Sequence, residues 1–426
     1  MSGLARSAVH AVLARIRSGR IELRESYSRR IKRFGPSDGA LDAAIDVHDP
    51  RFYDAVARRR SVGLGESYAD WLWDSPDLVG LLRIGARELL RLDPARRRLA
   101  PLARPVHRLA MLPLLNTRRG ARRNIAAHYD LGNEMFETFL DTESMMYSSA
   151  CFESEGQSLE EAQRNKLERI CGALELGPSD HLLEIGTGWG GLAVHAAREH
   201  GCRVTTTTIS HEQREYAESR VRAAGLEGLV TVLGDDYRTL RGRFDKVASI
   251  EMIEAVGWEY FDLFFRRCSE LLEPDGLMFL QAICIDDRAY EAEKSTRSFA
   301  NQLIFPGGCL PSVERIHRCL ASETDMRDVW LEDISPSYAL TLRAWRKRFT
   351  ASSPRLDQLG YDRRFRRLWE LYLAISEAGF RERRLNDVQI LCAKRGWSGR
   401  IPARSPRRLA SAEPRFTGAG SAVGRT

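Results

Sequence analysis

Short runs rich in Val, Ile, Leu and Thr alternate with amphipathic segments along the second half of the chain. The apolar runs occupy residues 181–186, 202–210, 229–234, 244–251 and 276–285, and helical patterns start at Gly191, run through Glu212–Ala224 and lie near Tyr260–Leu272. Alternation of this kind is typical of βαβ units, whose crossover helices cover a parallel sheet. The pattern therefore predicts an α/β fold with a doubly wound, mainly parallel sheet.

The flanking residues lack this alternation. The segment GLGESYADWLWDSPDLVGLL fits a small mixed fold or a helical one. From Arg96, prolines and many arginines interrupt the core periodicity, which favours a linker. We therefore expect an N-terminal companion domain with a basic linker (residues 1–110), a main domain (111–395) and a basic tail (396–426). The tail has few large apolar residues, and we expect it to be disordered.

Hydrophobic residues make up 43% and charged residues 29% of the 426 residues, which argues against a fibrous or mostly disordered chain. No run approaches the ~18–20 apolar residues of a membrane span, and the N-terminus lacks the apolar core of a signal peptide. The arginines of the N-terminus could mimic a transit peptide, but an amphipathic first helix explains them better. We expect a cytoplasmic protein.

Charge and cysteine content narrow the range of partners. The net charge of +7 favours an anionic partner, either nucleic acid or an acidic lipid surface. The eight cysteines are scattered and form no CxxC pair, so neither zinc-ligand spacing nor a disulfide framework is indicated. We expect buried, reduced thiols and no metal.

The most informative single motif is Glu184-Ile-Gly-Thr-Gly-Trp-Gly-Gly191, which follows a predicted strand and opens a predicted helix. Glycines at such a turn let the backbone approach a ligand closely. A dinucleotide site, an S-adenosylmethionine site and a structural turn all fit a glycine loop. The G-x-G-x-G spacing and the acid at the end of the strand favour S-adenosylmethionine, as in class I methyltransferases.

Polar residues after the next two strands complete a candidate cofactor site. The second strand ends in threonines without a ribose-binding carboxylate, so Gln213, in the next helix, is the candidate for the ribose. Asp235 and Asp236 follow the third strand and could accept from an adenine amino group, although one of them could instead cap a helix.

Several motifs in one order resemble those of cyclopropane-fatty-acyl-phospholipid synthases and related fatty-acid methyltransferases. They cover roughly residues 50–395 and comprise HYDLGN (128–133), MYSSA (146–150), LLEIGTGWGGLA, TTTISHEQ, SIEMIEAVG (249–257), IFPGGCLPS (304–312) and SPSYALTLRAW with Tyr338. The resemblance implies a class I methyltransferase fold with a seven-stranded sheet and a smaller N-terminal α+β or helical domain. It implies a cofactor site made by Tyr147, Ser148, Glu184, Gly186, Gly188, Gly190, Thr208, Ile209, Gln213, Asp235 and Asp236.

The same resemblance implies a catalytic pocket with Glu254 and Tyr338 around a bound bicarbonate. The chain departs from the family pattern in three places. Ser149 stands where Cys is common, Gln281 stands where His helps to hold the anion, and Ser376 stands where a Cys is often seen in the C-terminal segment. The Ser149 backbone, Gln281 and the Ile283 amide could still donate to bicarbonate. A group that can carry positive charge beside it is lost, which puts bicarbonate in doubt.

The chemistry explains these residue types. An alkene is a weak nucleophile, so its methylation requires close alignment with a sulfonium methyl group and exclusion of water. Glu254, oriented by Tyr338, could stabilise the carbocation that forms, with weaker help from the ring of Phe305. Proton loss from the new methyl group closes a cyclopropane ring, whereas a hydride shift before it leaves a methylene branch. Without the resemblance, Glu254 could be a solvent-facing carboxylate at a helix start, and Tyr338 a core tyrosine.

The sequence thus predicts that the chain forms a cyclopropane ring on an unsaturated phospholipid acyl chain, with methylene-branch formation as the alternative. The expected setting is the inner, anionic membrane surface, and a homodimer is compatible with the family. A nucleic-acid methyltransferase is disfavoured, because Ser249-Ile-Glu-Met252 replaces the Asn/Asp-Pro-Pro-aromatic segment and no Pro-Cys dipeptide occurs. A non-catalytic binding protein is disfavoured by the intact glycine loop.

Overall fold

A seven-stranded sheet forms the core of the main domain in the computed structural model, which describes residues 2–37, 41–111, 116–129, 131–294 and 296–399. The strand order is β10-β11-β9-β8-β5-β6-β7. The strands are β5 (His181–Ile185), β6 (Arg203–Thr207), β7 (Val230–Leu233), β8 (Phe244–Ile250), β9 (Leu272–Ile285), β10 (Arg327–Asp333) and β11 (Leu385–Ala393). Only β11 pairs antiparallel with its neighbours, β9 and β10. The predicted doubly wound, mainly parallel sheet is confirmed.

Alternating side chains on the strands feed two separate cores, one on each face. Leu182 of β5 packs in a buried cluster with α6 (Leu159–Ala173), α7 (Gly191–His200) and α8 (His211–Ala223). Its neighbour Leu183 packs in another cluster with α9 (Phe261–Leu271) and α11 (Val313–Glu323). Successive strand residues point to opposite faces, so a strand buried on both sides reads as a continuous apolar run. Helices therefore cover both faces.

The N-terminal residues form a small α+β unit. Its four-stranded sheet has the order β2-β1-β3-β4. It contains α1 (Ser2–Leu13), β1 (Arg20–Glu25), β2 (Arg30–Phe34), β3 (Asp42–Val47), α2 (Arg51–Ala69) and β4 (Trp73–Asp74). The unit continues into α3 (Leu78–Met111), so the expected linker from Arg96 is helical as far as Met111. Residues 400–426 of the expected tail lie outside the described residues.

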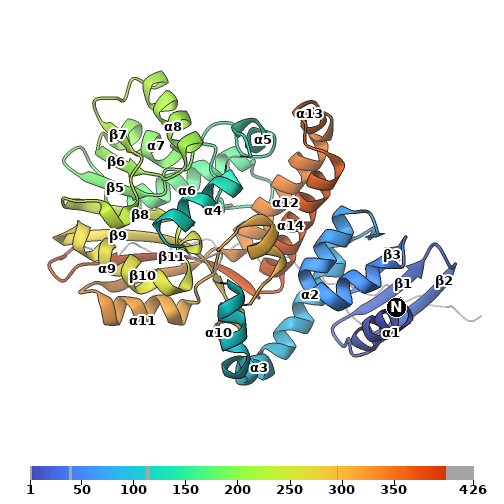
Figure 1. Cartoon of the computed structure of the whole chain (residues 1–426). Helices are drawn as coiled ribbons and strands as arrows, with labels where there is room; N and C mark the ends of the chain where they lie inside the picture. Colours follow the sequence, from blue (N-terminus) through green and yellow to red (C-terminus); the bar gives the residue numbers. More distant parts are fainter. Residues whose placement is uncertain (1, 38–40, 112–115, 130, 295, 400–426) are drawn as a thin grey trace, which may run out of the picture.

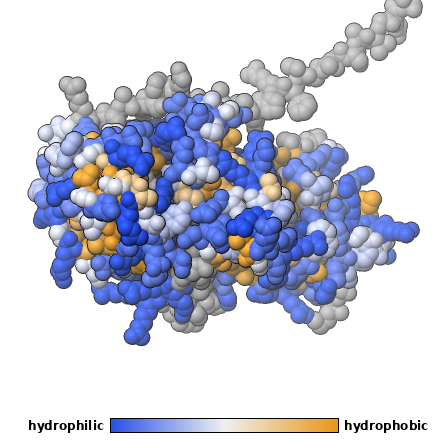
Figure 2. Space-filling view, turned by 90° about the horizontal axis from the view of Figure 1, so that it is seen from above, coloured by the Kyte–Doolittle hydropathy of each residue, from blue (hydrophilic) through white to orange (hydrophobic). Residues whose placement is uncertain are grey.

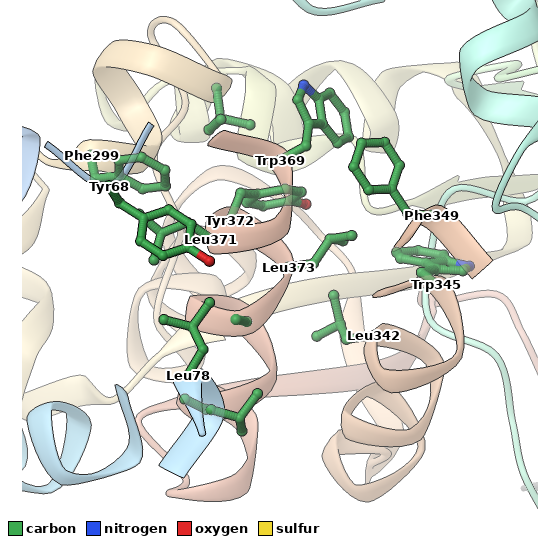
Figure 3. Close-up of a cluster of buried hydrophobic side chains, with 14 of the residues drawn as sticks. Tyr68, Leu78, Phe299, Leu342, Trp345, Phe349, Trp369, Leu371, Tyr372 and Leu373 are labelled. Carbon is green, nitrogen blue, oxygen red and sulfur yellow. The ribbon is translucent and has the colours of Figure 1, made fainter. Parts of the chain in front are cut away.

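Two long helices join the units, α12 (Ser335–Ala351) and α14 (Arg363–Arg381). Both α2 and α3 pack against α14, which lies between the N-terminal unit and the large sheet in Figure 1. Figure 3 shows Tyr68 and Leu78 beside Leu371 and Tyr372 of α14 in one buried cluster. The Arg367 guanidinium donates to the Tyr68 and Trp73 carbonyl oxygens. The two units therefore share a core.

Shorter elements complete the described structure. They are α4 (Arg118–Tyr129), α5 (Asn133–Glu137), α10 (Asp287–Glu293), α13 (Ser353–Gln358), the 3-10 turns η2 (Tyr237–Thr239), η3 (Ile253–Ala255) and η4 (Trp258–Tyr260), and the π-turn η5 (Ala300–Ile304).

Figure 2 shows a largely hydrophilic face with apolar side chains in small patches. Among the described residues, no helix is both long and apolar enough to span a bilayer.

Candidate active site

A pocket opens at the carboxyl ends of β5, β6, β7 and β8, where the strand order reverses. Ligands of open α/β sheets bind at such a switch point. Every residue expected to bind the cofactor lines it except Gly190: Tyr147, Ser148, Glu184, Gly186, Gly188, Thr208, Ile209, Gln213, Asp235 and Asp236. Further lining comes from Met252 and from Ile125 of α4.

The loop between β5 and α7 requires glycine for its backbone. Gly186 and Gly188 have φ values of +104° and +51°, and Gly190, at +83°, is the N-cap of α7. Residues with a Cβ rarely adopt such values. A Cβ on Gly186 would lie 3.0 Å from the Cγ of Met252. The loop thus keeps the floor of the pocket free of side chains. Gly190 does not line the pocket, but it allows the turn into α7.

Polar groups on β5 and β6 are held by neighbouring threonines. The Thr206 hydroxyl donates to Glu184 at 2.6 Å, and burial raises the pKa of this carboxyl to about 8. The Thr208 hydroxyl donates to Oε1 of Gln213 at 3.0 Å, in the first turn of α8. Both the acid and the amide are therefore fixed in position at the pocket wall.

The two aspartates after β7 have different surroundings. Asp236 is buried, caps η2 and accepts from the guanidinium of Arg238 at 2.6 and 2.8 Å, which holds its pKa below the usual range despite burial. Asp235 is exposed beside the pocket. The capping alternative thus applies to Asp236, and Asp235 is the carboxylate available to a ligand.

A loop from Tyr147 to Ser149 closes one side of the pocket. The Tyr147 hydroxyl donates to that of Tyr372 at 3.2 Å, and its ring stacks on Phe305 with centroids 6.5 Å apart. The fully buried Lys166 of α6 donates to the Ser148 hydroxyl at 2.6 Å. A cation inside the protein thus fixes the loop that covers the pocket.

The catalytic candidates converge on a carboxylate that the sequence reasoning did not choose, Glu251 at the end of β8. Its Oε1 accepts from the Ser149 amide and from Nε2 of Gln281, both at 2.7 Å, and its Oε2 accepts from the Tyr338 hydroxyl at 2.7 Å. Glu251 also lines the cofactor pocket. Its φ of +48° is rare for a residue with a Cβ, a strain found mostly at functional sites.

Glu254 has a different set of contacts from those expected. Its Oε1 accepts from the Ile283 amide at 2.6 Å. Its Oε2 is buried and has no hydrogen-bond partner in the described part of the chain. The expectation that Tyr338 orients Glu254 is wrong, because the tyrosine hydroxyl donates to Glu251.

The two carboxyl groups influence each other's protonation. Burial raises the pKa of Glu254 to about 8, and the charge of Glu251 adds to the rise. Burial also raises the pKa of Glu251, but the Tyr338 hydrogen bond, the Lys166 charge and the Ser149 amide oppose this. Hydrogen bonds to a charged form favour that form. The hydrogen bonds and the Lys166 charge therefore favour ionisation of Glu251 over ionisation of Glu254.

The expected bicarbonate does not fit this arrangement. Of its expected donors, Ser149, Gln281 and Tyr338 donate to Glu251, and Ile283 donates to Glu254. A further anion would face the charge of Glu251 while the donors expected for it are already engaged, in surroundings that penalise unpaired charge. A carboxylate of the chain takes up the donors that the family resemblance assigns to bicarbonate.

Two further buried groups escaped the sequence reasoning. Asp387 of β11 accepts from Nε2 of Gln281 at 3.1 Å, and burial holds its pKa well above the usual range. Lys166 lies near Glu251 although 85 residues separate them, and burial lowers its pKa to about 8. No local pattern marks either residue. Glu251 could have been found, since it is the last residue of a predicted strand, at the ligand-binding edge.

Comparison with known proteins agrees with the fold and with the pocket. The family model described as mycolic acid cyclopropane synthetase matches residues 116–390. The tuberculostearic acid methyltransferase UfaA1 of Mycobacterium tuberculosis is 38% identical over 379 residues, covering 84% of this chain and 87% of that protein. The cyclopropane-fatty-acyl-phospholipid synthase of Escherichia coli K12 is 35% identical over 365 residues, covering 83% and 87%.

A solved structure shows the same architecture with a product of the cofactor bound. Mycolic acid cyclopropane synthase CmaA1, in complex with SAH and CTAB, superposes with a TM-score of 0.60 at 28% identity, covering 64% of this chain and 98% of that one. The relatives act on lipid acyl chains, and the pocket at the switch point suits the shared cofactor. This chain is therefore an S-adenosylmethionine-dependent methyltransferase and belongs to the mycolic acid cyclopropane synthetase family.

Proposed function

We propose that the chain methylates the double bond of an unsaturated acyl chain in a phospholipid, and that Glu251 removes the proton that completes the reaction. One observation carries the second part: the Glu251 carboxylate lines the cofactor pocket and holds three hydrogen bonds from Ser149, Gln281 and Tyr338. The cofactor residues expected from the sequence are proposed in the roles stated for them, with Asp235 rather than Asp236 facing adenine.

The residues have separate tasks in this mechanism. Bound S-adenosylmethionine supplies an electrophilic methyl group, and the alkene forms a bond to it as the sulfur–carbon bond breaks. The positive charge left on the acyl chain is stabilised by the Glu251 carboxylate and by the aromatic rings of Tyr147, Phe305 and Tyr372. Glu251 then accepts a proton from the transferred methyl carbon. Because the carbocation is very acidic, the position of this base matters more than its pKa.

The protonated Glu254 has a supporting task. It keeps the Ile283 amide paired and adds no second negative charge beside Glu251. The Lys166 charge favours the ionised form of Glu251, and so replaces in part the histidine that is common in the family where this chain has Gln281. We therefore assign base catalysis to Glu251, and positioning to Tyr338, Gln281 and Ser149.

The product that we favour is a methylene-branched acyl chain, formed when a hydride shift precedes the proton loss. The support is the 38% identity to a protein named tuberculostearic acid methyltransferase, together with the departures from the bicarbonate-binding set at Ser149 and Gln281. The Glu251 carboxylate, which accepts from the donors expected for bicarbonate, adds to this support. Cyclopropane formation begins with the same methyl transfer and ends with the same proton loss, so it is the other candidate.

Proton NMR of lipids made by the enzyme separates the two products. The chain is expressed in a host without such an enzyme, and the extracted phospholipids are examined. We expect vinylidene proton signals. Upfield cyclopropane signals without vinylidene protons would establish the other product, and unmodified phospholipid beside a modified free fatty acid would contradict the proposed substrate.

The rate should rise with pH, because the base must be ionised. Burial raises the pKa of Glu251, so the acidic limb of the kcat profile should lie above the ordinary range of a glutamate. Lys166 lowers that pKa, and Lys166→Met should therefore move the limb to higher pH. Turnover measured from acidic to mildly alkaline pH tests this, with circular dichroism to verify folding. An unshifted limb in a folded Lys166→Met variant would contradict the assignment.

The substrate is presented, in our proposal, at an anionic membrane surface. The support is the net charge of +7 and the name of the Escherichia coli relative, which specifies a fatty-acyl phospholipid. A homodimer and a location on the inner membrane face remain predictions.

A further inference from the structure

A cluster of potential metal ligands lies between α6 and α7, away from the cofactor pocket. The thiol of Cys171 and the imidazole nitrogens of His195 and His200 all lie within 4.8 Å of one another. Nε2 of His195 is 3.0 Å from one Glu168 oxygen, and Nε2 of His200 is 3.6 Å from the other. Two helices thus bring one thiol, two imidazoles and one carboxylate together.

The Nε2 atoms of His195 and His200 have lone pairs that a metal ion could use. Both Nε2 atoms are buried, and within the described ranges of the chain their contacts with the Glu168 carboxylate do not have the geometry of a hydrogen bond. Buried polar atoms are normally hydrogen-bonded, because an unpaired one loses its hydration without compensation. A metal ion would bind both lone pairs at once. The Glu168 side chain is 52% exposed and borders the cluster, which gives an ion a route from solvent.

The ligand set favours zinc among the common ions. Thiolate, imidazole and carboxylate are the protein ligands of tetrahedral Zn²⁺, whereas Mg²⁺ and Ca²⁺ prefer oxygen alone. In a tetrahedral site the sulfur and nitrogen atoms would lie about 3.3–3.6 Å apart. To reach this spacing, side-chain rotations must draw the thiol and imidazole ligand atoms together by up to about 1.5 Å and swing the Glu168 carboxylate in beside them. The ligands come from two separate helices, so they do not form a short sequence motif typical of a zinc site.

We propose that Cys171, His195, His200 and Glu168 form a Zn²⁺ site that ties α6 to α7. On binding, the Cys171 thiol gives its proton to solvent as the sulfur–zinc bond forms. His200 is the last residue of α7, whose first turn follows the glycine loop, so the ion also meets the negative end of the helix dipole. The site lies ~15 Å, one helix length, from that loop and would brace α7 without touching the cofactor.

Metal titration of the purified full chain, stripped with a chelator and dialysed, tests the proposal. We expect one Zn²⁺ per chain, and Co²⁺ in its place should give the absorption of a cobalt–thiolate bond. Cys171→Ser should abolish that absorption, and His195→Gln and Cys171→Ser should each weaken Zn²⁺ binding by at least about 10–100-fold, since loss of outer partners alone has that effect.

Matched variants control for cysteine or histidine loss elsewhere. Cys309→Ser removes a half-buried thiol outside the cluster, and His211→Gln removes an exposed imidazole on α8; both should bind Zn²⁺ like the wild type. If Cys171→Ser does not fold, His200→Gln at the rim replaces it. Absence of bound Zn²⁺, or equal binding by the wild type and the folded cluster variants, would overturn the proposal.

Discussion

Glu251→Gln should lower kcat by about 10²–10⁴-fold, the usual contribution of a positioned base. Glutamine keeps the size of the side chain but cannot accept the proton, and its amide would oppose donors from Ser149, Gln281 and Tyr338. Affinity for S-adenosylhomocysteine should change only a few-fold. Transfer of labelled methyl groups to phospholipid, together with calorimetry of cofactor binding, measures both quantities.

Glu254→Gln is the matched control. Glutamine at this position still accepts from the Ile283 amide and imitates the protonated acid that we infer there. Its kcat should therefore stay much closer to that of the wild type. A large loss in Glu254→Gln beside a small loss in Glu251→Gln would reverse the assignment of the base.

Gly186→Val should abolish measurable cofactor binding, with an affinity loss of at least about 100-fold. The position has φ of +104°, where a β-branched residue is strained by about 1–3 kcal/mol, and a Cβ there would lie 3.0 Å from Met252. The valine side chain would also fill the close approach that the cofactor needs. Calorimetry with S-adenosylhomocysteine measures the loss.

Gly225→Val is the control, because it introduces similar backbone strain at a position that does not line the cofactor pocket. Its φ is +67°, and a Cβ there would have no neighbour within 4 Å. This variant should lose stability but keep its cofactor affinity. Equal affinity losses in both variants would show that strain in the fold, rather than the pocket floor, causes the effect.

The sequence predicted the parallel part of the sheet closely. The expected strand at residues 181–186 is β5, and the helix expected at Glu212–Ala224 is α8, one residue displaced. These elements are buried on both faces or clearly amphipathic, so their periodicity is strong. The antiparallel β10 and β11 were not placed. β10 is largely exposed and has charged residues at both ends, so its apolar centre is short.

Long-range packing limited the prediction of the rest. Prolines after Arg96 suggested that regular secondary structure ends there, yet helix α3 continues to Met111. The amide donors that the prolines lack do not end this helix. The contact between α2 and α14 joins residues about 300 positions apart, such as Tyr68 and Arg367, and no local pattern encodes it.

The sequence predicted most residues of the candidate site, but not which carboxylate accepts their hydrogen bonds. Ser149, Gln281 and Tyr338 meet around one carboxylate as expected for a catalytic pocket, but that carboxylate belongs to Glu251. The SIEMIEAVG segment contains two glutamates, and only the turn after β8 decides which one faces the donors. That turn depends on the positive φ of Glu251, which sequence reasoning does not anticipate for a residue with a Cβ.

The bicarbonate dependence of turnover tests the central claim most directly. The purified enzyme is assayed in buffer stripped of carbon dioxide and again with bicarbonate added back, with unsaturated phospholipid vesicles as the substrate. If Glu251 is the base, the wild-type rate should be the same in both, and Glu251→Gly, which opens the position of the carboxylate, should be stimulated by added bicarbonate. A wild-type enzyme that is inactive until bicarbonate is added would contradict the account.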